Sequence, residues 1–383
     1  MKGKKGRKGQ PLRVIQACDL QAGGITSLIL SICEQLDREK VNFDYLVYRN
    51  QPEFGDEKVK EYGGKKLIAD NTDAPNQMAR FLWKFWRTWK VLKEEQVEIF
   101  HINAPTPYDC LVGIAAKLAG ARVVVLHSHN SRLKKPGVGH RIFQEICRFC
   151  LPLCGDYYFA CSDLAGEFMY GKRPRKRIVY VKNGIDTEYF RFDEEYRNKM
   201  REDYGIGDAL VFGNIGRLCE QKNQRFLLYI FAEIRKIKPD AKLILIGQGE
   251  LEAELSELAD SLGIRDNLIR IAATEHVREY LCMMDGFLLP SLFEGLPVVG
   301  VEAQASGLPC VFSDSITREV SLSDRAHFLS LKRSAQDWAR FAVAMAEAAK
   351  ENRKVYADVI KSDGFEIKDT ARWLQNFYLE SLS

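Results

Sequence analysis

Residues Leu288–Ser313, LLPSLFEGLPVVGVEAQASGLPCVFS, contain the pattern that decides the fold. We expect a short apolar strand, a tight turn at Glu294-Gly295, a helix opened by Pro297, a stop at Gly307 and a second strand. Proline fits the first helical turn, where its missing N–H is not needed, and glycine fits just past a helix end. A strand, a helix and a further strand in this order indicate a parallel sheet covered by helices.

Two carboxylates mark this segment, Glu294 on the turn before the helix and Glu302 within the helix. Eight helical residues span about 12 Å at a rise of ~1.5 Å each. This separation exceeds the roughly 5–9.5 Å between the paired acids of a glycoside hydrolase. The spacing instead suits two acids that bind hydroxyls at opposite ends of one elongated polyol ligand.

The bulk composition is that of a soluble two-domain protein. A length of 383 residues suggests two domains of roughly 100–200 residues each. No apolar run approaches the ~18 residues of a membrane span, and no apolar secretion signal opens the chain, so we expect a cytoplasmic location. The net charge of +4 is small, but residues 1–13 are rich in Lys and Arg and hold no acid. We predict a disordered basic tail over residues 1–10, with contact to anionic lipid as the alternative.

Three of the ten cysteines, Cys147, Cys150 and Cys154, are closely spaced. Their i, i+3, i+7 spacing places them on one face of a helix, where free cysteine behaves as a small buried hydrophobe. We therefore favour core packing over a metal site for these thiols.

The first half of the chain alternates strands with helices. Leu12–Ala17 is a predicted strand that leads through Gly23-Gly24 into a helix over about 27–38. A glycine pair before a helix lets the backbone approach an anion and directs free N–H groups at it. Further strands are predicted at 43–48, 66–68, 98–103, 122–127, 157–161 and 177–181, with helices at 108–119, 139–151 and 163–170.

A helix predicted over 78–95 has a strongly apolar face. Phe81, Leu82, Phe85, Trp86, Trp89 and Leu92 are expected on one side and Lys84, Arg87 and Lys90 on the other. We favour packing of the apolar face on the sheet, with a membrane interface as the alternative.

Strand–helix alternation predicts a parallel sheet whose ligand crevice lies beyond the carboxyl ends of its strands. The sequence HSHNS stands at such an end and brings His127, His129 and Asn130 to a position where chemistry is expected.

The second half repeats this pattern. Strands are predicted at 210–215, 242–246, 268–271 and 286–289, and helices at 224–237, 250–262, 277–284, 334–350 and 370–381. The division we predict is a first domain over 11–190, a second over 191–364, and a final helix over 365–383.

Glu294 and Glu302, eight residues apart in FEGLPVVGVEAQASGLP, resemble the E-x7-E signature of family 4 glycosyltransferases, and the similarity extends over nearly the whole chain. The chain particularly resembles bacterial capsule and exopolysaccharide transferases. The resemblance implies an α/β GT-B fold, with two doubly wound Rossmann-like domains facing across a cleft. It also implies that the final helix packs back on the first domain.

The resemblance also assigns roles to residues. Glu294, with the backbone at Gly295 and Leu296, is expected to hold the transferred sugar, and Glu302 the ribose hydroxyls. Arg217 and Lys222 are expected to hold the diphosphate and stabilise its leaving charge. His129, with His127 as the reserve, is expected to face the donor sugar. Gly23 and Gly24 are expected beside the diphosphate and acceptor, and Gly247 and Gly249 in the nucleotide pocket, although Ala272-Ala273 stands where relatives often have glycine.

The implied reaction is retaining transfer of a hexose-type sugar from a nucleoside diphosphate, UDP by resemblance, to a glycan or lipid-linked acceptor. No Asp-x-Asp pair occurs in the chain, so we expect no metal cofactor. Contact with nucleic acid is not expected, and contact with an anionic membrane is an open alternative. Two rival functions are a sugar-nucleotide 2-epimerase and a catalytically silent partner protein.

Overall fold

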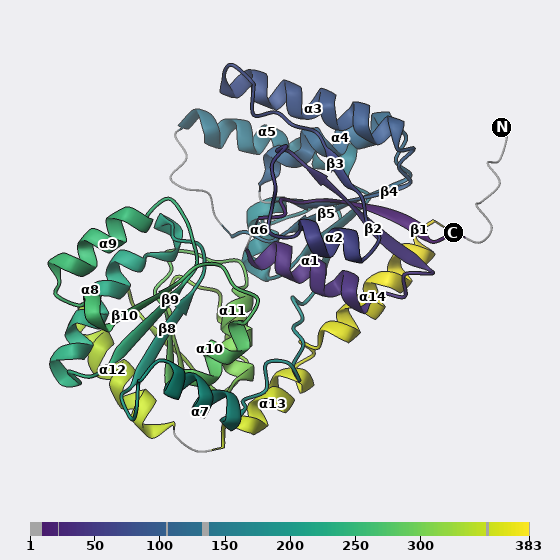
Figure 1. Cartoon of the computed structure of the whole chain (residues 1–383). Coiled ribbons are helices and arrows are strands. Elements are labelled where there is room, and N and C mark those ends of the chain that lie inside the picture. The colour runs from purple at the N-terminus through teal and green to yellow at the C-terminus, as the bar shows by residue number, and fades with distance from the viewer. Residues whose placement is uncertain (1–9, 22, 105, 132–137, 350–351, 383) are drawn as a thin grey trace. The chain divides into compact units, whose positions relative to one another are not determined.

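A computed structural model describes residues 10–21, 23–104, 106–131, 138–349 and 352–382 (Figure 1). The chain divides into two compact units. Unit 1 consists of Met1–Lys182 and Ile367–Ser383, and unit 2 of Asn183–Glu366. The predicted basic tail falls almost wholly outside the described residues.

Unit 1 is built on a parallel sheet. Among the described residues it has seven strands in the order β3-β2-β1-β4-β5-β6-β7. The central strands are buried along their length, as in a sheet covered by helices on both faces. The strands are β1 (Leu12–Ala17), β2 (Val41–Val47), β3 (Lys66–Ile68), β4 (Ile99–Ala104), β5 (Val123–Ser128), β6 (Tyr157–Ala160) and β7 (Ile178–Tyr180).

The helices of unit 1 pack on this sheet. Asn76 and Ser162 accept backbone N–H groups and so begin two of them, and Gly120, in the left-handed region, ends a third. The helices are α1 (Gly24–Gln35), α2 (Asp56–Glu61), α3 (Gln77–Glu94), α4 (Cys110–Ala119), α5 (Val138–Cys154), α6 (Asp163–Tyr170) and α14 (Ile367–Glu380).

Unit 2 has the same architecture, with six parallel strands in its described part and the order β10-β9-β8-β11-β12-β13. The strands are β8 (Val211–Ile215), β9 (Lys242–Ile246), β10 (Leu268–Ile271), β11 (Gly286–Leu289), β12 (Cys310–Ser313) and β13 (Ala326–Leu329). The helices are α7 (Glu194–Asp203), α8 (Gln224–Ile237), α9 (Glu252–Ser261), α10 (Val277–Met283), α11 (Val298–Ala305), α12 (Ala335–Ala348) and α13 (Tyr356–Ser362). Two doubly wound α/β units confirm the predicted fold class.

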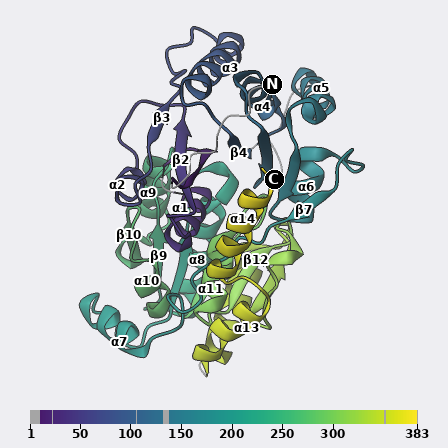
Figure 2. The ribbon, with the colours of Figure 1, turned by 90° about the vertical axis from the view of Figure 1, so that its right-hand side faces the viewer.

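The chain passes between the units twice, near residues 182 and 366. Ile185 N–H donates to the Phe365 carbonyl at 2.8 Å, and Thr187 Oγ1 donates to Glu366 Oε2 at 2.5 Å. These two contacts tie residues 183–190 to unit 2, so the division falls about eight residues before the predicted one. The final helix, α14, belongs to unit 1, where it packs beside α1 (Figures 1 and 2).

Several predicted elements differ from the structure. Helix α1 begins and ends three residues earlier than predicted, because Gly24 already belongs to its first turn. Strand β13 and the helices α2 and α13 were not predicted. These are short segments in which charged and polar residues interrupt the apolar pattern.

The predicted face of α3 is partly wrong. Leu82 and Trp86 are exposed, by 55% and 58%, whereas Lys84 turns inward. Lys84 Nζ lies 2.7 Å from Asp109 Oδ1 and over the ring of Tyr48. Burial alone would lower the pKa of the Lys84 ammonium, but Asp109 and Tyr48 raise it above its ordinary value. Lys84 therefore occupies part of the inward side of the helix, and one edge of the apolar face remains in solvent.

The cysteines of α5 pack as predicted. Cys147 and Cys154 are buried and Cys150 is partly buried, and all three are free thiols. Among the described residues no group of His, Cys, Asp and Glu is arranged to hold a metal ion. Within the same residues, no helix combines the length and apolar character required to cross a bilayer.

Candidate functional site

In unit 2, the predicted site residues lie on loops at the carboxyl ends of neighbouring strands. The loop after β8 carries Lys222 and the loop after β11 carries Glu294. Lys222 Nζ lies 2.7 Å from Glu294 Oε1, and both side chains are mostly buried. Strand order changes direction beside β8, and such a switch point is where open α/β sheets bind ligands.

Several hydrogen bonds hold these two loops together. Gln221 donates through Nε2 to the Phe293 carbonyl at 3.0 Å and to Glu294 Oε2 at 3.3 Å. Asn223 takes the left-handed conformation, with φ 56°, and its side chain donates to the Pro290 carbonyl at 3.0 Å. The cation and the carboxylate are therefore placed by backbone contacts rather than by their own attraction alone.

Arg217 lies on the same loop as Lys222 but has a different partner. Its guanidinium is 3.2 Å from Glu250 Oε2, on the loop after β9, and its side chain is 61% exposed. In this structure the two predicted diphosphate-binding cations thus belong to separate ion pairs. Arg217 is free to reorient, because an exposed ion pair of this kind stabilises by only about 0–1 kcal/mol.

Gly247 and Gly249 allow two loops to touch. Gly247 has φ 137°, and a Cβ there would lie 2.1 Å from the Gly216 carbonyl oxygen. A Cβ on Gly249 would lie 2.3 Å from the Leu218 carbonyl oxygen. The backbone bonds from Gly216 N–H to Ile246 and from Leu218 N–H to Gln248 run through this contact. In the structure these glycines therefore serve the approach of one loop to the next.

Glu302 lies on α11 and differs from Glu294 in having no charged partner. Within the described chain, no hydrogen bond or ion pair reaches its carboxyl group. Glu302 is partly buried, and desolvation of its carboxyl raises the pKa of Glu302 to about 7. Gly295 and Leu296, which were predicted to contact the sugar, are buried next to Glu294 on the turn that precedes α11.

Unit 1 places His127 and His129 in a buried polar network at the carboxyl ends of β1, β4 and β5. His101 Nδ1 is 2.6 Å from the Tyr378 hydroxyl, and His101 Nε2 is 3.1 Å from His127 Nδ1. The rings of His127 and His129 lie 4.1 Å apart between centroids. Three further hydrogen bonds close the network: His129 Nε2 to Asn103 Oδ1 (3.1 Å), Asn103 Nδ2 to Gln16 Oε1 (3.0 Å) and Gln16 Nε2 to Tyr378 (3.2 Å).

All three histidines of this network are held neutral. Burial lowers the pKa of His101 to about 3 and that of His129 to about 4. Burial and the two neighbouring imidazoles lower the pKa of His127 well below its ordinary value. Among the described residues, His127 Nε2 and His129 Nδ1 are buried without a hydrogen-bond partner. Orphaned buried nitrogens of this kind are costly and mark a position where a ligand group could bind.

Gly23 and Gly24 lie at the beginning of α1, as predicted. No side chain of the described residues caps this helix, so its first N–H groups lack a capping oxygen there. Gly23 is extended, with φ 172°, and a Cβ there would come no closer than 3.9 Å to Gln21. The local backbone therefore does not require glycine at this position.

Sequence reasoning missed most of the residues that surround the histidines. Tyr378 and Gln16 are 362 residues apart in the chain and meet only through the return of α14 to unit 1. His101 stands at alternate spacing in a buried strand, where a structural interpretation is the ordinary one. The one available signal was the number of polar side chains at the ends of adjacent predicted strands.

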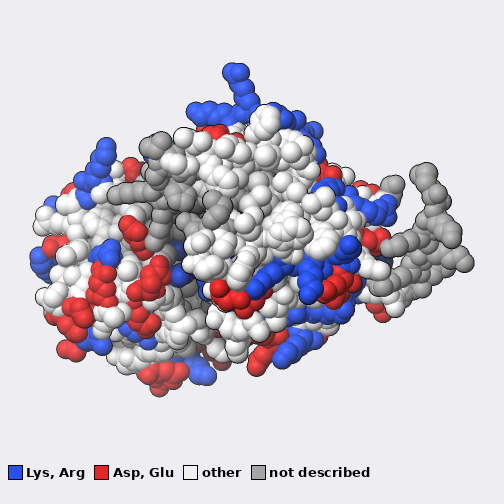
Figure 3. Space-filling model, turned by 90° about the horizontal axis from the view of Figure 1, so that it is seen from above, with Lys and Arg blue, Asp and Glu red and all other residues white. Residues whose placement is uncertain are grey.

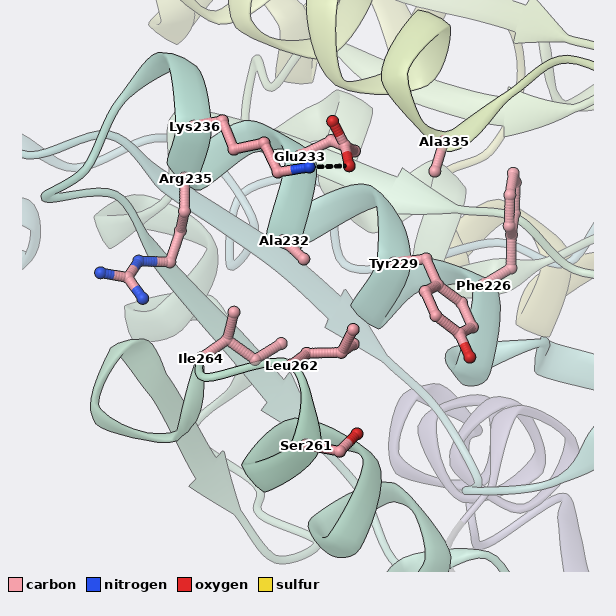
Figure 4. A pocket seen from close by; sticks show the side chains of 10 residues that line it. All are labelled: Phe226, Tyr229, Ala232, Glu233, Arg235, Lys236, Ser261, Leu262, Ile264 and Ala335. Carbon is pink, nitrogen blue, oxygen red and sulfur yellow. Dashed lines mark hydrogen bonds and ion pairs between the residues drawn. The ribbon is translucent and has the colours of Figure 1, made fainter.

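A hollow elsewhere in unit 2 lacks a comparable set of polar groups. It lies between α8 and the end of α9, and its charged groups are already used (Figure 4). Lys236 pairs with Glu233 at 2.5 Å, and Arg235 donates to the Gly263 carbonyl at 2.8 Å. This hollow is not a strong candidate site.

Comparison with known families now bears on these sites. Residues 22–189 match the family description Glycosyltransferase Family 4, and residues 196–361 match Glycosyl transferases group 1. The Bacillus subtilis protein EpsF, named as a glycosyltransferase, is 31% identical over 370 residues, which are 94% of each chain. The chain belongs to the family 4 glycosyltransferases.

Other relatives of this glycosyltransferase are more distant. An Escherichia coli UDP-Gal:alpha-D-GlcNAc-diphosphoundecaprenol alpha-1,3-galactosyltransferase is 28% identical over 59% of this chain and 60% of its own. The structure of Anabaena Alr3699/HepE in complex with UDP-glucose superposes with a TM-score of 0.78 and 16% identity. It covers 97% of this chain and all of that one. This structural match, together with the two parallel-sheet units, confirms the predicted GT-B fold class.

Proposed function

We propose that this glycosyltransferase moves a hexose-type sugar from a UDP-sugar to a glycan or lipid-linked saccharide, in surface polysaccharide synthesis, with retention of configuration. The observation that carries the proposal is the Lys222–Glu294 ion pair, at a strand-order switch and 2.7 Å long. Support for the donor comes from relatives, since HepE is solved with UDP-glucose and the Escherichia coli enzyme is named for UDP-Gal.

Each acid has a separate role in this proposal. Glu294 binds hydroxyls of the transferred sugar, beside the backbone of Gly295 and Leu296. Glu302 accepts hydrogen bonds from both ribose hydroxyls, since a carboxylate has two acceptor oxygens. Its lack of a charged partner supports this role, because ribose hydroxyls would supply the missing donors.

The cations act on the leaving group. Lys222 and Arg217 neutralise the diphosphate, so that negative charge gained as the glycosidic bond breaks is stabilised in the transition state. Lys222 would exchange Glu294 for a phosphate oxygen, and Arg217 would exchange its exposed contact with Glu250. The leaving phosphate draws the proton of the attacking acceptor hydroxyl on the same face of the sugar. Protein cations alone serve this step, without a metal.

In unit 1, His129 contacts the donor sugar, and Gly23 and Gly24 lie beside the diphosphate and acceptor. The unpartnered Nδ1 of His129 and Nε2 of His127 support a ligand contact there. We place the enzyme in the cytoplasm at the inner face of the membrane, because lipid-linked acceptors are held there.

Calorimetry with UDP-sugars and with GDP-mannose, each with and without EDTA, tests the donor. We expect UDP-sugar binding that EDTA leaves unchanged and that Glu302→Ala abolishes. NMR of the donor incubated alone separates transfer from 2-epimerisation, because only an epimerase changes the donor without acceptor. Binding of no donor, or epimerisation, would contradict the proposal. NMR of the product's anomeric proton tests retention.

A further inference from the structure

A row of large apolar side chains lies exposed along α5. Ile142, Ile146, Phe149 and Leu153 are exposed by 60%, 54%, 65% and 71%. Their i, i+4, i+7, i+11 spacing keeps them within one narrow arc over about 16 Å of helix. A second face of the same helix packs in the core through its cysteines. Helix α5 is therefore apolar on two sides, and only one of them is covered within the described chain.

The neighbouring helices extend this row into a surface. Helix α4 packs against both α3 and α5, and Phe81 of α3 contacts Phe143 of α5. The uncovered edge of α3 adds Leu82 and Trp86. Figure 3 looks onto this side of unit 1 and shows a broad area without charged groups, edged by both basic and acidic side chains. Exposed apolar surface of this extent is rare on monomers and marks an interaction site.

The loop between α6 and β7 gives this surface a positive edge. Its sequence, Lys172–Arg177, is KRPRKR. The Arg175 guanidinium lies 4.5 Å from the ring centroid of Phe149, so the basic loop adjoins the apolar row directly. Arg173 and Arg177 are exposed, and no described carboxylate pairs with either of them. Nearby acids are neutralised within unit 1, as Glu145 is by Arg148 and Asp156 by Lys117.

We propose that α5, the edge of α3 and the Lys172–Arg177 loop form one surface that docks on an anionic lipid bilayer. Apolar side chains beside unpaired arginines match the interface of such a bilayer, where acyl chains lie beneath negative headgroups. A helix with a large apolar face and basic residues beside it is the pattern of an element that lies in a membrane interface. This proposal deepens the proposed membrane location but is independent of the sugar-transfer chemistry.

Vesicle flotation tests the surface directly. The full chain is expected to float with vesicles of phosphatidylcholine and phosphatidylglycerol, and much less with phosphatidylcholine alone. Ile146→Ser/Phe149→Ser is expected to weaken binding about tenfold or more. Arg173→Ala/Arg177→Ala is expected to weaken binding to the anionic vesicles alone, with a smaller salt dependence. The matched control, Val355→Ser/Val359→Ser in unit 2, replaces two exposed aliphatic side chains and is expected to bind normally.

Two results would overturn this proposal. One is that Ile146→Ser/Phe149→Ser and the native protein bind the anionic vesicles equally, or that neither binds them. The other is a dimer in light scattering that this double variant dissociates, since the surface would then join two copies. Thermal unfolding of each variant excludes misfolding as the cause.

A second inference rests on the hydrogen-bond directions of the histidine network. Gln16 Nε2 donates to the Tyr378 hydroxyl, and we assign that hydroxyl's own proton to His101 Nδ1, 2.6 Å away. A neutral imidazole has one donor and one acceptor nitrogen, so His101 donates through Nε2 to His127 Nδ1. His127 is left with its proton on Nε2, one of the two unpartnered nitrogens.

The other branch from Tyr378 fixes His129. With Gln16 Nε2 on Tyr378, Gln16 Oε1 accepts from Asn103 Nδ2. Asn103 Oδ1 is then the atom that faces His129 Nε2, and an amide oxygen can only accept a hydrogen bond. His129 therefore carries its proton on Nε2 and has a lone pair on Nδ1. We infer that Tyr378 is a positioning residue that sets both tautomers, so that His127 offers a donor and His129 an acceptor to the same ligand.

Long-range ¹H–¹⁵N NMR of the histidines tests this inference. In the native protein both His127 and His129 are expected as Nε2–H tautomers, and in Tyr378→Phe as mixtures. The control is Tyr158→Phe, which also removes a buried hydroxyl, but one without a partner in the described chain. Gln16→Met breaks the same network and replaces Tyr378→Phe if that variant does not fold.

Steady-state kinetics of sugar transfer provide a second test of this inference, and this test rests on the proposed function. Tyr378→Phe is expected to lower kcat about tenfold with little change in donor KM, as for a group that holds a contact made in the transition state. Unchanged tautomers in Tyr378→Phe, or an Nδ1–H tautomer of His129 in the native protein, would overturn the inference. A native protein that shows the expected tautomers but has no transferase activity would instead contradict the proposed function.

Discussion

The two candidate sites lie at equivalent places in their sheets but use opposite electrostatics. Unit 2 places formal charges at strand ends, with Lys222 against Glu294 and Arg217 against Glu250. Unit 1 places neutral side chains there and buries three imidazoles whose protonation is disfavoured. Charges suit a diphosphate that gains charge during the reaction, and neutral donors and acceptors suit hydroxyls. The same architecture thus supports two different kinds of recognition.

Removal of the unit 2 cation should have the largest effect. Lys222→Met is expected to lower kcat/KM about 10²–10³-fold, as for loss of one group that stabilises transition-state charge. Lys236→Met removes an exposed lysine of the same unit that also pairs with a glutamate, and should leave kcat/KM unchanged. Steady-state kinetics with the donor found by calorimetry measure both. Activity of Lys222→Met close to the native value would show that unit 2 does not depend on this charge.

Substitution of one glycine in each unit should affect stability very differently. Gly247→Ala is expected to destabilise unit 2 by about 2–4 kcal/mol, because a Cβ would meet the Gly216 carbonyl at 2.1 Å and φ is positive. Gly23→Ala, where a Cβ has space, should leave the unfolding free energy nearly unchanged. Urea denaturation of both variants checks the difference. Should Gly23→Ala lose transfer activity while remaining stable, the close approach of a ligand would be the remaining reason for glycine there.

Lowering the pH should destabilise unit 1 through its buried histidines. The pKa values of His101 and His129, about 3 and about 4, lie below the ordinary 6.5, so the folded protein binds fewer protons than the unfolded chain between these values. Their contribution is complete above pH 6.5 and is lost as pH falls toward 4, at about 1.4 kcal/mol per pH unit for each histidine.

At pH 5 this amounts to roughly 2 kcal/mol for each histidine. Denaturant unfolding at pH 7 and pH 5, followed by tyrosine and tryptophan signals of unit 1, measures it. His101→Asn should lessen the acid loss, whereas His276→Asn, which alters an exposed histidine of unit 2, should not. An equal acid loss in both variants would contradict the origin proposed here.

The sequence predicted most elements but few of the contacts that position side chains. Strands such as Lys242–Ile246 and helices such as Gln224–Ile237 follow from local apolar patterns and were predicted to the residue. The orientation of α3 was not predicted correctly, because the apolar arc of this helix is wider than the surface that covers it. Local periodicity does not reveal the tertiary contact between Lys84 and Asp109, which lies on the covered side. The Tyr378–Gln16 contact depends on the return of α14, which no local pattern specifies.

The smallest expected effect is the pH dependence of nucleotide affinity that Glu302 confers, and it decides whether unit 2 binds its ligand with charged groups alone. With a pKa of about 7, its carboxyl is about half protonated at neutral pH. Hydroxyls that donate to it favour the ionised form, so nucleotide affinity should rise from pH 6 to pH 8 by up to about tenfold. Glu302→Gln should bind weakly and without this pH dependence, because an amide has one acceptor oxygen and does not titrate. Calorimetry with UDP at both pH values measures the change, with Glu347→Gln as the control for an exposed acid of the same unit. If affinity does not change with pH in the native protein, Glu302 does not bind the ribose as a carboxylate, and the contrast with the neutral site of unit 1 would rest on Lys222, Glu294 and Arg217 alone.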